Sequence, residues 1–197
     1  MLRRLELALL IGILISVALS SLGAFAAQSA QLREEVLRLH VVANSDDAAD
    51  QAIKLVVRDA VLAARPDVFV SGQTKAEATS AICLPEIEQI AKDAIMDNGY
   101  FYPVSAELVN MYFSTRQYED FTLPAGRYDA IRLIIGQGAG ENWWCVMFPP
   151  MCIPAAQPGE QHYLEDKIAR LGQSPSYRPK FAVVELIENL REALMAG

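Results

Sequence analysis

Few residues in this chain have side chains that could carry chemistry: it contains two histidines and three cysteines. His40 and His162 each lack a metal-ligating neighbour at a usable spacing, so both are interpreted as surface histidines. His40, Ser45 and Asp46 have the side chains of a catalytic triad and lie close together in sequence. A triad requires contact in space, however, and capping of a following helix already accounts for Ser45 and Asp46. The sequence therefore predicts no catalytic, cofactor-binding or metal-binding residues.

A glycine-rich run, Gly136-Gln-Gly-Ala-Gly140, superficially resembles a nucleotide-binding loop. Phosphate binding would need a helix amino-terminus directly after the glycines, whereas this run separates two predicted strands. We interpret it as a flexible hairpin turn. The carboxylates are scattered along the chain, and no acid/base pair stands out.

The cysteines suggest a disulfide. Cys145 and Cys152 flank a short segment with Pro149 and Pro150 at a bend, so the two sulfurs could meet if the protein is exported to an oxidising compartment. Closing so short a loop would contribute about 2–3 kcal/mol by the chain-entropy estimate. Cys83 falls on a helical stretch and is interpreted as a buried, small hydrophobic residue.

The pattern of apolar residues predicts the elements that must position these side chains. Alternation over residues 37–43 indicates a strand with one buried face, and helical spacing follows over residues 46–65 and 74–98, the second broken at Pro85. Strands are expected at 106–115, 128–135 and 143–148. A helix at 181–194 ends the pattern, with Val184, Ile187, Leu190 and Leu194 as its apolar edge. The order β-α-α-β-β-β-α predicts an α/β domain with a sheet of about four strands and helices packed on it.

The amino-terminal segment reads as an export signal. Arg3 and Arg4 precede an apolar run over residues 7–22, and Ala24 and Ala26 provide the small-x-small pattern that a signal peptidase needs. Cleavage between Ala26 and Ala27 is therefore expected. An uncleaved membrane anchor is the alternative, because residues 7–27 are long enough to span a bilayer. Either outcome places the rest of the chain outside the cytoplasm.

These observations divide the chain into four parts: a signal peptide or anchor at 1–26, a tether or short helix at 27–36, a core α/β domain at 37–153, and a proline-rich connection with the final helix at 154–197. The chain has 17 basic and 24 acidic side chains, a formal net charge of −7. That balance argues against a nucleic-acid partner and against electrostatic binding to anionic lipid, so membrane contact is expected only through the amino-terminal segment.

Two segments together carry a resemblance to a known family. The first is LRLHVVANSD at 37–46, continued by DQAIKLVVRDAV at 50–61. The second is LPAGRYDAIRLIIG at 123–136 with GENWWCVMFPPMC at 140–152. Both resemble the stage II sporulation protein R family of endospore-forming bacteria, and the likeness covers most of residues 37–153.

The resemblance implies a role that composition does not show. Proteins of this family are exported from the forespore into the space between forespore and mother cell. There they activate a membrane-embedded aspartic protease of the mother cell, which cleaves the precursor of sigma factor E. The catalytic residues in that reaction belong to the partner, which implies that this chain is a signal without a cofactor and without enzymatic activity of its own.

Trp143 and Trp144 are the candidate interaction residues. They are adjacent on a predicted strand, so their side chains point to opposite faces of the sheet. Either both faces are covered, or one tryptophan is exposed as an interface anchor. Two other functions stay open at this point: an exported hydrolase acting on cell wall or peptide, and a passive binding module.

Overall fold

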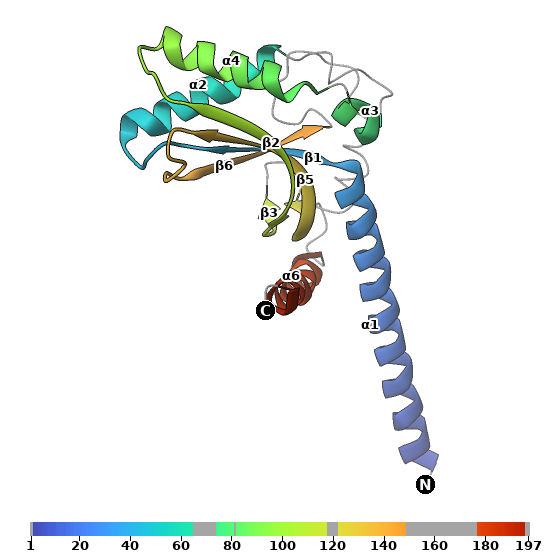
Figure 1. The fold of residues 1–197 in the computed structure, drawn as a ribbon. Coiled ribbons are helices and arrows are strands. Elements are labelled where there is room, and N and C mark those ends of the chain that lie inside the picture. Colours follow the sequence, from blue (N-terminus) through green and yellow to red (C-terminus); the bar gives the residue numbers. More distant parts are fainter. Residues whose placement is uncertain (1, 65–73, 81, 118–121, 149–176, 196–197) are drawn as a thin grey trace.

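The computed structural model is a four-stranded mixed sheet between two helical layers, with one long helix projecting from it (Figure 1). It describes residues 2–64, 74–80, 82–117, 122–148 and 177–195. The helices are α1 (Leu2–Glu35), α2 (Ala48–Ala64), α3 (Lys75–Ser80), α4 (Leu84–Asp97) and α6 (Tyr177–Met195). The strands are β1 (Leu37–Val42), β2 (Val104–Phe113), β3 (Arg116–Gln117), β4 (Thr122–Leu123), β5 (Gly126–Ile135) and β6 (Asn142–Phe148). The predicted α/β class and its order of main elements are confirmed, and the short β3–β4 pair is an addition.

The first strand, β1, lies inside the sheet. The strand order is β2-β5-β1-β6, with β1 parallel to β5 and antiparallel to β6. All six residues of β1 are buried. The prediction of a strand with one buried face was therefore wrong. Alternation indicated one apolar side correctly, but helical elements cover the polar side as well, so Arg38 and His40 are enclosed.

Each face of the sheet has its own apolar cluster. On one face α2 and α4 pack on the sheet through a cluster that includes Leu39, Ile53, Val57, Ile87 and Ile95. The opposite face is covered by the carboxyl-terminal part of α1 and by α6, through a cluster that includes Phe25, Leu32, Tyr128, Phe181 and Val184. Figure 1 shows the two layers above and below the sheet.

Helix α1 differs from the segment expected from sequence. Residues 28–35, predicted as a tether or short helix, continue α1 without interruption as far as Glu35. The physical reason is that Phe25 and Leu32 recur at helical spacing and are buried against the sheet. The apolar amino-terminal half projects from the domain with its leucines and isoleucines exposed (Figure 1). By length and composition this helix is able to cross a membrane, which is compatible with export.

Candidate functional site

The two sequence segments that carry the family resemblance meet at the carboxyl end of β1. Asn44 Nδ2 and Ser45 Oγ both donate to the Asp50 Oδ2 atom, over 2.8 and 2.6 Å. These hydrogen bonds, from Ser45 first and Asn44 second, lower the pKa of Asp50 because they stabilise its charged form. Ser45 thus contacts Asp50, while the His40 ring contacts Asn142. The structure does not assemble the triad considered from sequence.

The glycine-rich run belongs to the same junction. It connects β5 to β6, and these strands are not neighbours, because β1 lies between them. The hairpin interpretation was therefore wrong: residues 136–140 cross over the carboxyl end of β1 to connect β5 with β6. Gly140 N donates to Ala43 O over 3.0 Å, and Glu141 N donates to Asp46 Oδ1 over 2.7 Å. Asp46 consequently fixes this loop, while the Ser45 hydroxyl accepts a hydrogen bond from the amide of Asp47 before α2.

His40 lies on the sheet face covered by α1 and α6, and only 4% of its surface is exposed. Its Nε2 atom lies 2.6 Å from the Asn142 Oδ1 atom, which only accepts, so Nε2 carries the proton. The ring stacks on Trp144 with centroids 3.9 Å apart. The prediction of a surface histidine was wrong. A neutral imidazole can be buried on a sheet face where an alternating pattern suggests solvent.

Burial lowers the pKa of His40, and the nearby Arg132 and Arg38 charges act in the same direction, against the hydrogen bond that His40 donates to Asn142. The unfolded chain then binds a proton at this site at a higher pH than the folded protein does. We expect the free energy of unfolding to fall as the pH drops below about 6.5, the ordinary pKa of histidine. In His40→Gln this part of the pH dependence should disappear. Urea unfolding of both proteins between neutral pH and pH 5 measures it, and an unchanged slope in the variant would exclude His40 as the cause.

The two tryptophans point to opposite faces, as predicted, and each packs against its own cluster. Trp143 joins the cluster beneath α2, where the Arg58 guanidinium lies 4.8 Å from its ring centroid. Trp144 joins the other cluster and makes an edge contact with Phe113 at 4.8 Å between centroids. Both rings are partly buried. The arrangement matches a sheet covered on two faces, and a role of either ring in binding a partner stays a prediction.

Two of the three cysteines, Cys83 and Cys145, are among the described residues. Cys83 is a free thiol directly before α4 and is exposed, so its interpretation as a buried residue was wrong. Pro85 near the start of α4 ends the preceding helical stretch earlier than expected and leaves Cys83 at the boundary. Cys145 is buried on β6. Cys152 lies outside the described residues, as does His162, so the Cys145–Cys152 disulfide stays a prediction.

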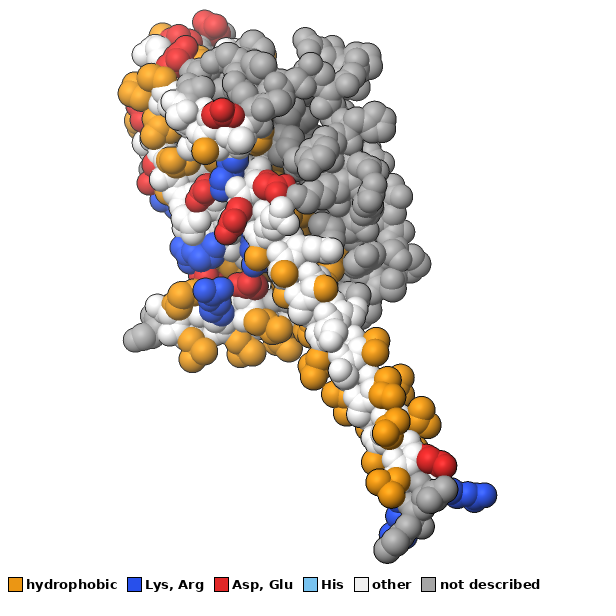
Figure 2. Space-filling view, turned by 90° about the vertical axis from the view of Figure 1, so that its right-hand side faces the viewer, with side chains coloured by type: hydrophobic (Ala, Val, Ile, Leu, Met, Phe, Trp, Pro, Cys, Tyr) orange, Lys and Arg blue, Asp and Glu red, His pale blue; other side chains and the backbone are white. Residues whose placement is uncertain are grey.

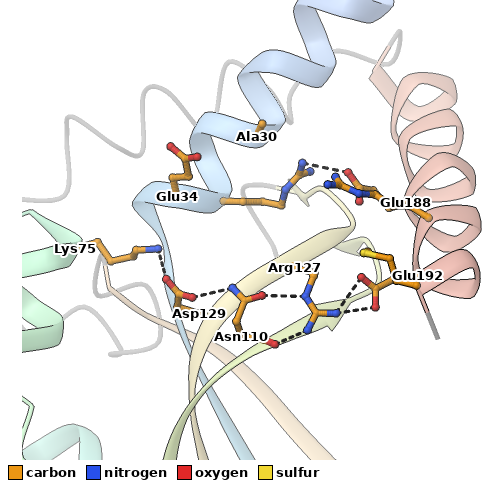
Figure 3. Close-up of a pocket in the computed structure, with 11 residues that line it drawn as sticks. Ala30, Glu34, Lys75, Asn110, Arg127, Asp129, Glu188 and Glu192 are labelled. Carbon is orange, nitrogen blue, oxygen red and sulfur yellow. Dashed lines mark hydrogen bonds and ion pairs between the residues drawn. The ribbon is translucent and has the colours of Figure 1, made fainter. Parts of the chain in front are cut away.

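A pocket with a volume of about 370 Å³ opens beside α1, between the ends of β2 and β5 and the helix α6. Its lining holds four basic and four acidic side chains (Figure 3). The lining residues are Ala30, Arg33, Glu34, Lys75, Asn110, Arg127, Asp129, Glu188, Arg191, Glu192 and Met195.

A chain of polar contacts crosses the floor of this pocket (Figure 3). Lys75 Nζ donates to Asp129 over 2.7 Å, and Asn110 donates to Asp129 over 2.8 Å. Arg127 continues the chain by donating to Asn110 over 2.9 Å and to Glu192 over 2.8 Å. Burial acts to raise the pKa of Asp129, but the hydrogen bonds from Lys75 and Asn110 outweigh it and the pKa is lowered.

The pocket offers recognition more readily than catalysis. Among the described residues that line it, none is a histidine, cysteine or hydroxyl side chain that could act as a base or nucleophile. No cluster of His, Cys, Asp or Glu among the described residues could hold a metal ion. Alternating charges instead suit a polar peptide whose own charges complement them. Sequence reasoning missed this site because its residues come from five separate elements and have no common motif.

Comparisons with known proteins identify the family of the chain. A family profile described as Stage II sporulation protein R matches residues 33–157. The stage II sporulation protein R of Bacillus subtilis (strain 168) is 36% identical over 136 residues, which are 68% of this chain and 60% of the relative. The chain belongs to the stage II sporulation protein R family. This membership supports a role in sporulation. No solved structure matches the chain.

The matched region separates the features described above into two groups. The junction at the end of β1, His40 and both tryptophans lie within residues 33–157, the part that defines the stage II sporulation protein R family. Helix α6 lies beyond it, and the pocket draws on both parts. The fold of the shared region therefore explains the sequence motifs, and α6 has to be interpreted from its own contacts.

Proposed function

We propose that this protein is an exported signal of endospore formation that activates a membrane-embedded aspartic protease of the mother cell, which then cleaves the precursor of sigma factor E. Its site of action is the space between forespore and mother cell. The observation that carries the proposal is membership of the stage II sporulation protein R family across most of the folded domain. The apolar half of α1 supports export.

The roles of the polar motif residues support a signal over an exported hydrolase. The Ser45 hydroxyl donates a hydrogen bond to Asp50, and Asp46 accepts one from the loop after β5. The buried His40 ring stacks on Trp144. Each of these side chains therefore has a structural role in the fold. The protease supplies the catalytic residues, and this chain supplies a binding surface.

The charged pocket beside α1 is the surface that we assign to the protease. It lies beside the carboxyl-terminal part of α1 (Figure 3), and so on the exported side of a membrane that the apolar half of α1 would cross. Glu34 and Arg191 line it without forming any of the ion pairs found among the described residues. Both side chains are exposed, so their charges can contact a segment of the partner.

Co-expression with the cognate protease and sigma precursor in non-sporulating cells tests the proposal. Glu34→Lys and Arg191→Glu should each reduce precursor cleavage at least tenfold, because each places a like charge against the group it would bind. Asp97→Lys is the matched control, since Asp97 is exposed on α4 away from the pocket, and it should cleave normally. Equal cleavage by all three variants would remove the pocket from the proposal.

The same assay distinguishes a signal from a hydrolase. His40→Gln and Cys83→Ser should retain most of the precursor cleavage, as should His162→Ala. If one of these changes abolished cleavage while folding and export stayed normal, catalysis by this chain would replace the signalling proposal.

A further inference from the structure

Helix α6 presents its most apolar side away from the domain. Leu186, Leu190 and Leu194 have 61, 57 and 84% of their surfaces exposed, and Ile187 has 51%. These residues, with Val183, recur at spacings of three and four and form one continuous stripe, called here the α6 stripe. The sequence predicts Val184, Ile187, Leu190 and Leu194 as one apolar edge; in the structure Val184 packs against the domain, whereas the other three are exposed.

A different side of the helix makes the contacts with the domain. Phe181 and Val184 pack into the cluster beneath the sheet, and Phe181 meets Phe25 of α1 edge-on with ring centroids 5.0 Å apart. Glu188 accepts a hydrogen bond from Arg33 over 3.2 Å, and Glu192 accepts one from Arg127. Helix α6 is thus held in place by its mixed side, and this leaves the α6 stripe facing outward.

The position of Phe25 fixes the level of α6 relative to a bilayer. The hydrocarbon core is about 30 Å thick, which a helix crosses in about 20 residues. Counted from Leu7, after the charges of Arg3, Arg4 and Glu6, 20 residues end at Ala26. Phe25 therefore lies at the outer boundary of the bilayer when α1 spans it, and Phe181 holds α6 at that same level.

The direction of the α6 stripe agrees with this level. Helix α6 is seen nearly end-on in Figure 1, where α1 runs within the plane of the view, so the two helices cross steeply. In Figure 2 the hydrophobic side chains of α6 line its lower edge, on the same side as the apolar half of α1. A bilayer spanned by α1 would therefore run along the α6 stripe.

We propose that α6 is an interfacial membrane helix, which lies on the outer surface of the bilayer with the α6 stripe inserted among the acyl chains. The stripe is entirely apolar, and α6 as a whole carries three acidic and three basic side chains by sequence. Its binding therefore depends on apolar burial and not on anionic headgroups. The domain then has two membrane contacts, and α6 still holds it at the surface after cleavage at Ala26. This proposal departs from the expectation that only the amino-terminal segment contacts the membrane, because it adds α6 as a second contact.

Depth-dependent fluorescence quenching of the full chain in vesicles of phosphatidylethanolamine and phosphatidylglycerol tests the proposal. An NBD probe is attached to Leu190→Cys in a Cys83→Ser background, and to Asp97→Cys as the aqueous control. Nitroxide on shallow acyl positions should quench the probe at position 190 at least twofold more than the probe at 97, whereas iodide in the buffer should quench only the probe at 97. The Cys83→Ser protein without an added cysteine reports labelling at the remaining cysteines.

A second variant tests whether the apolar side chains of the α6 stripe cause the insertion. With the probe at Leu194→Cys, the double change Leu186→Ser and Leu190→Ser should lower quenching by acyl nitroxide at least twofold, because it removes apolar side chains that would insert into the bilayer. Both leucines are exposed, so the side of α6 that packs on the domain is unchanged. Iodide access to position 190 equal to that at 97 would overturn the proposal. So would efficient disulfide formation between Leu190→Cys chains with no lipid quenching, since that would place a second copy on the α6 stripe.

Discussion

Gly140→Ala is expected to lower the free energy of unfolding by more than about 3 kcal/mol, at the upper end of what overpacking costs. A Cβ atom at this position would lie 2.1 Å from the backbone carbonyl oxygen of Ser45, and a backbone atom cannot rotate away as a side chain would. The loop after β5 would have to lift from the end of β1. That movement would break the hydrogen bonds of Gly140 with Ala43 and of Glu141 with Asp46.

Gly99→Ala is the matched control for the glycine prediction. Gly99 has φ of +81°, and a Cβ atom there would meet nothing within 4 Å. Its substitution should therefore cost only the conformational strain of the left-handed region, about 1–2 kcal/mol. Chemical denaturation of the three proteins compares them. If Gly140→Ala were as stable as Gly99→Ala, the loop after β5 would have moved to fit the Cβ atom without a further loss of stability.

Trp144→Ala is expected to cost about 3–5 kcal/mol of stability, the usual effect of removing a large aromatic side chain from a core. Its ring stacks on His40 and contacts Phe113, so truncation leaves a cavity on the side of the sheet that faces α1 and α6. Precursor cleavage should fall in proportion to the loss of folded protein.

Measuring stability and cleavage on the same variant separates packing from binding. If Trp144→Ala melts near the normal temperature but fails to activate cleavage, the ring acts at an interface with the partner. Trp143→Ala is the comparison on the other face, where the Arg58 guanidinium covers the ring. Loss of activation without loss of stability in only one of the two would identify the face that binds.

The main elements could be predicted because their signals are local. Helix α4 has a regular apolar stripe and ends before Gly99, whose left-handed conformation is typical of a glycine just after a helix. Strands β5 and β6 alternate clearly. The position of β1 in the sheet could not be predicted this way, since pairing is decided by contacts between distant residues. His40 and the loop after β5 were misplaced for that reason: both depend on β1 lying between β5 and β6.

The candidate functional surfaces could be predicted even less well than the strand order, because they depend on contacts between residues far apart in the sequence. Arg127 and Glu192 are 65 positions apart and meet only because α6 returns beneath the sheet. The sequence predicted one apolar edge on α6, but in the structure only Val184 of that edge packs against the domain, together with Phe181. Sequence patterns report that a helix is amphipathic, but they do not report which side meets the protein.

The burial of Phe25 sets an order of events during export. Its side chain is enclosed beside Phe181, and it sits between Ala24 and Ala26 within an unbroken helix. A signal peptidase needs its substrate extended, so the predicted cleavage at Ala26 would have to occur before this part of α1 docks under the sheet. Processing and folding would then compete in time: a chain that folds first would keep its anchor, and a chain that is cut first would fold without Phe25. The ratio of the two rates would determine how many molecules remain tethered to the membrane of origin.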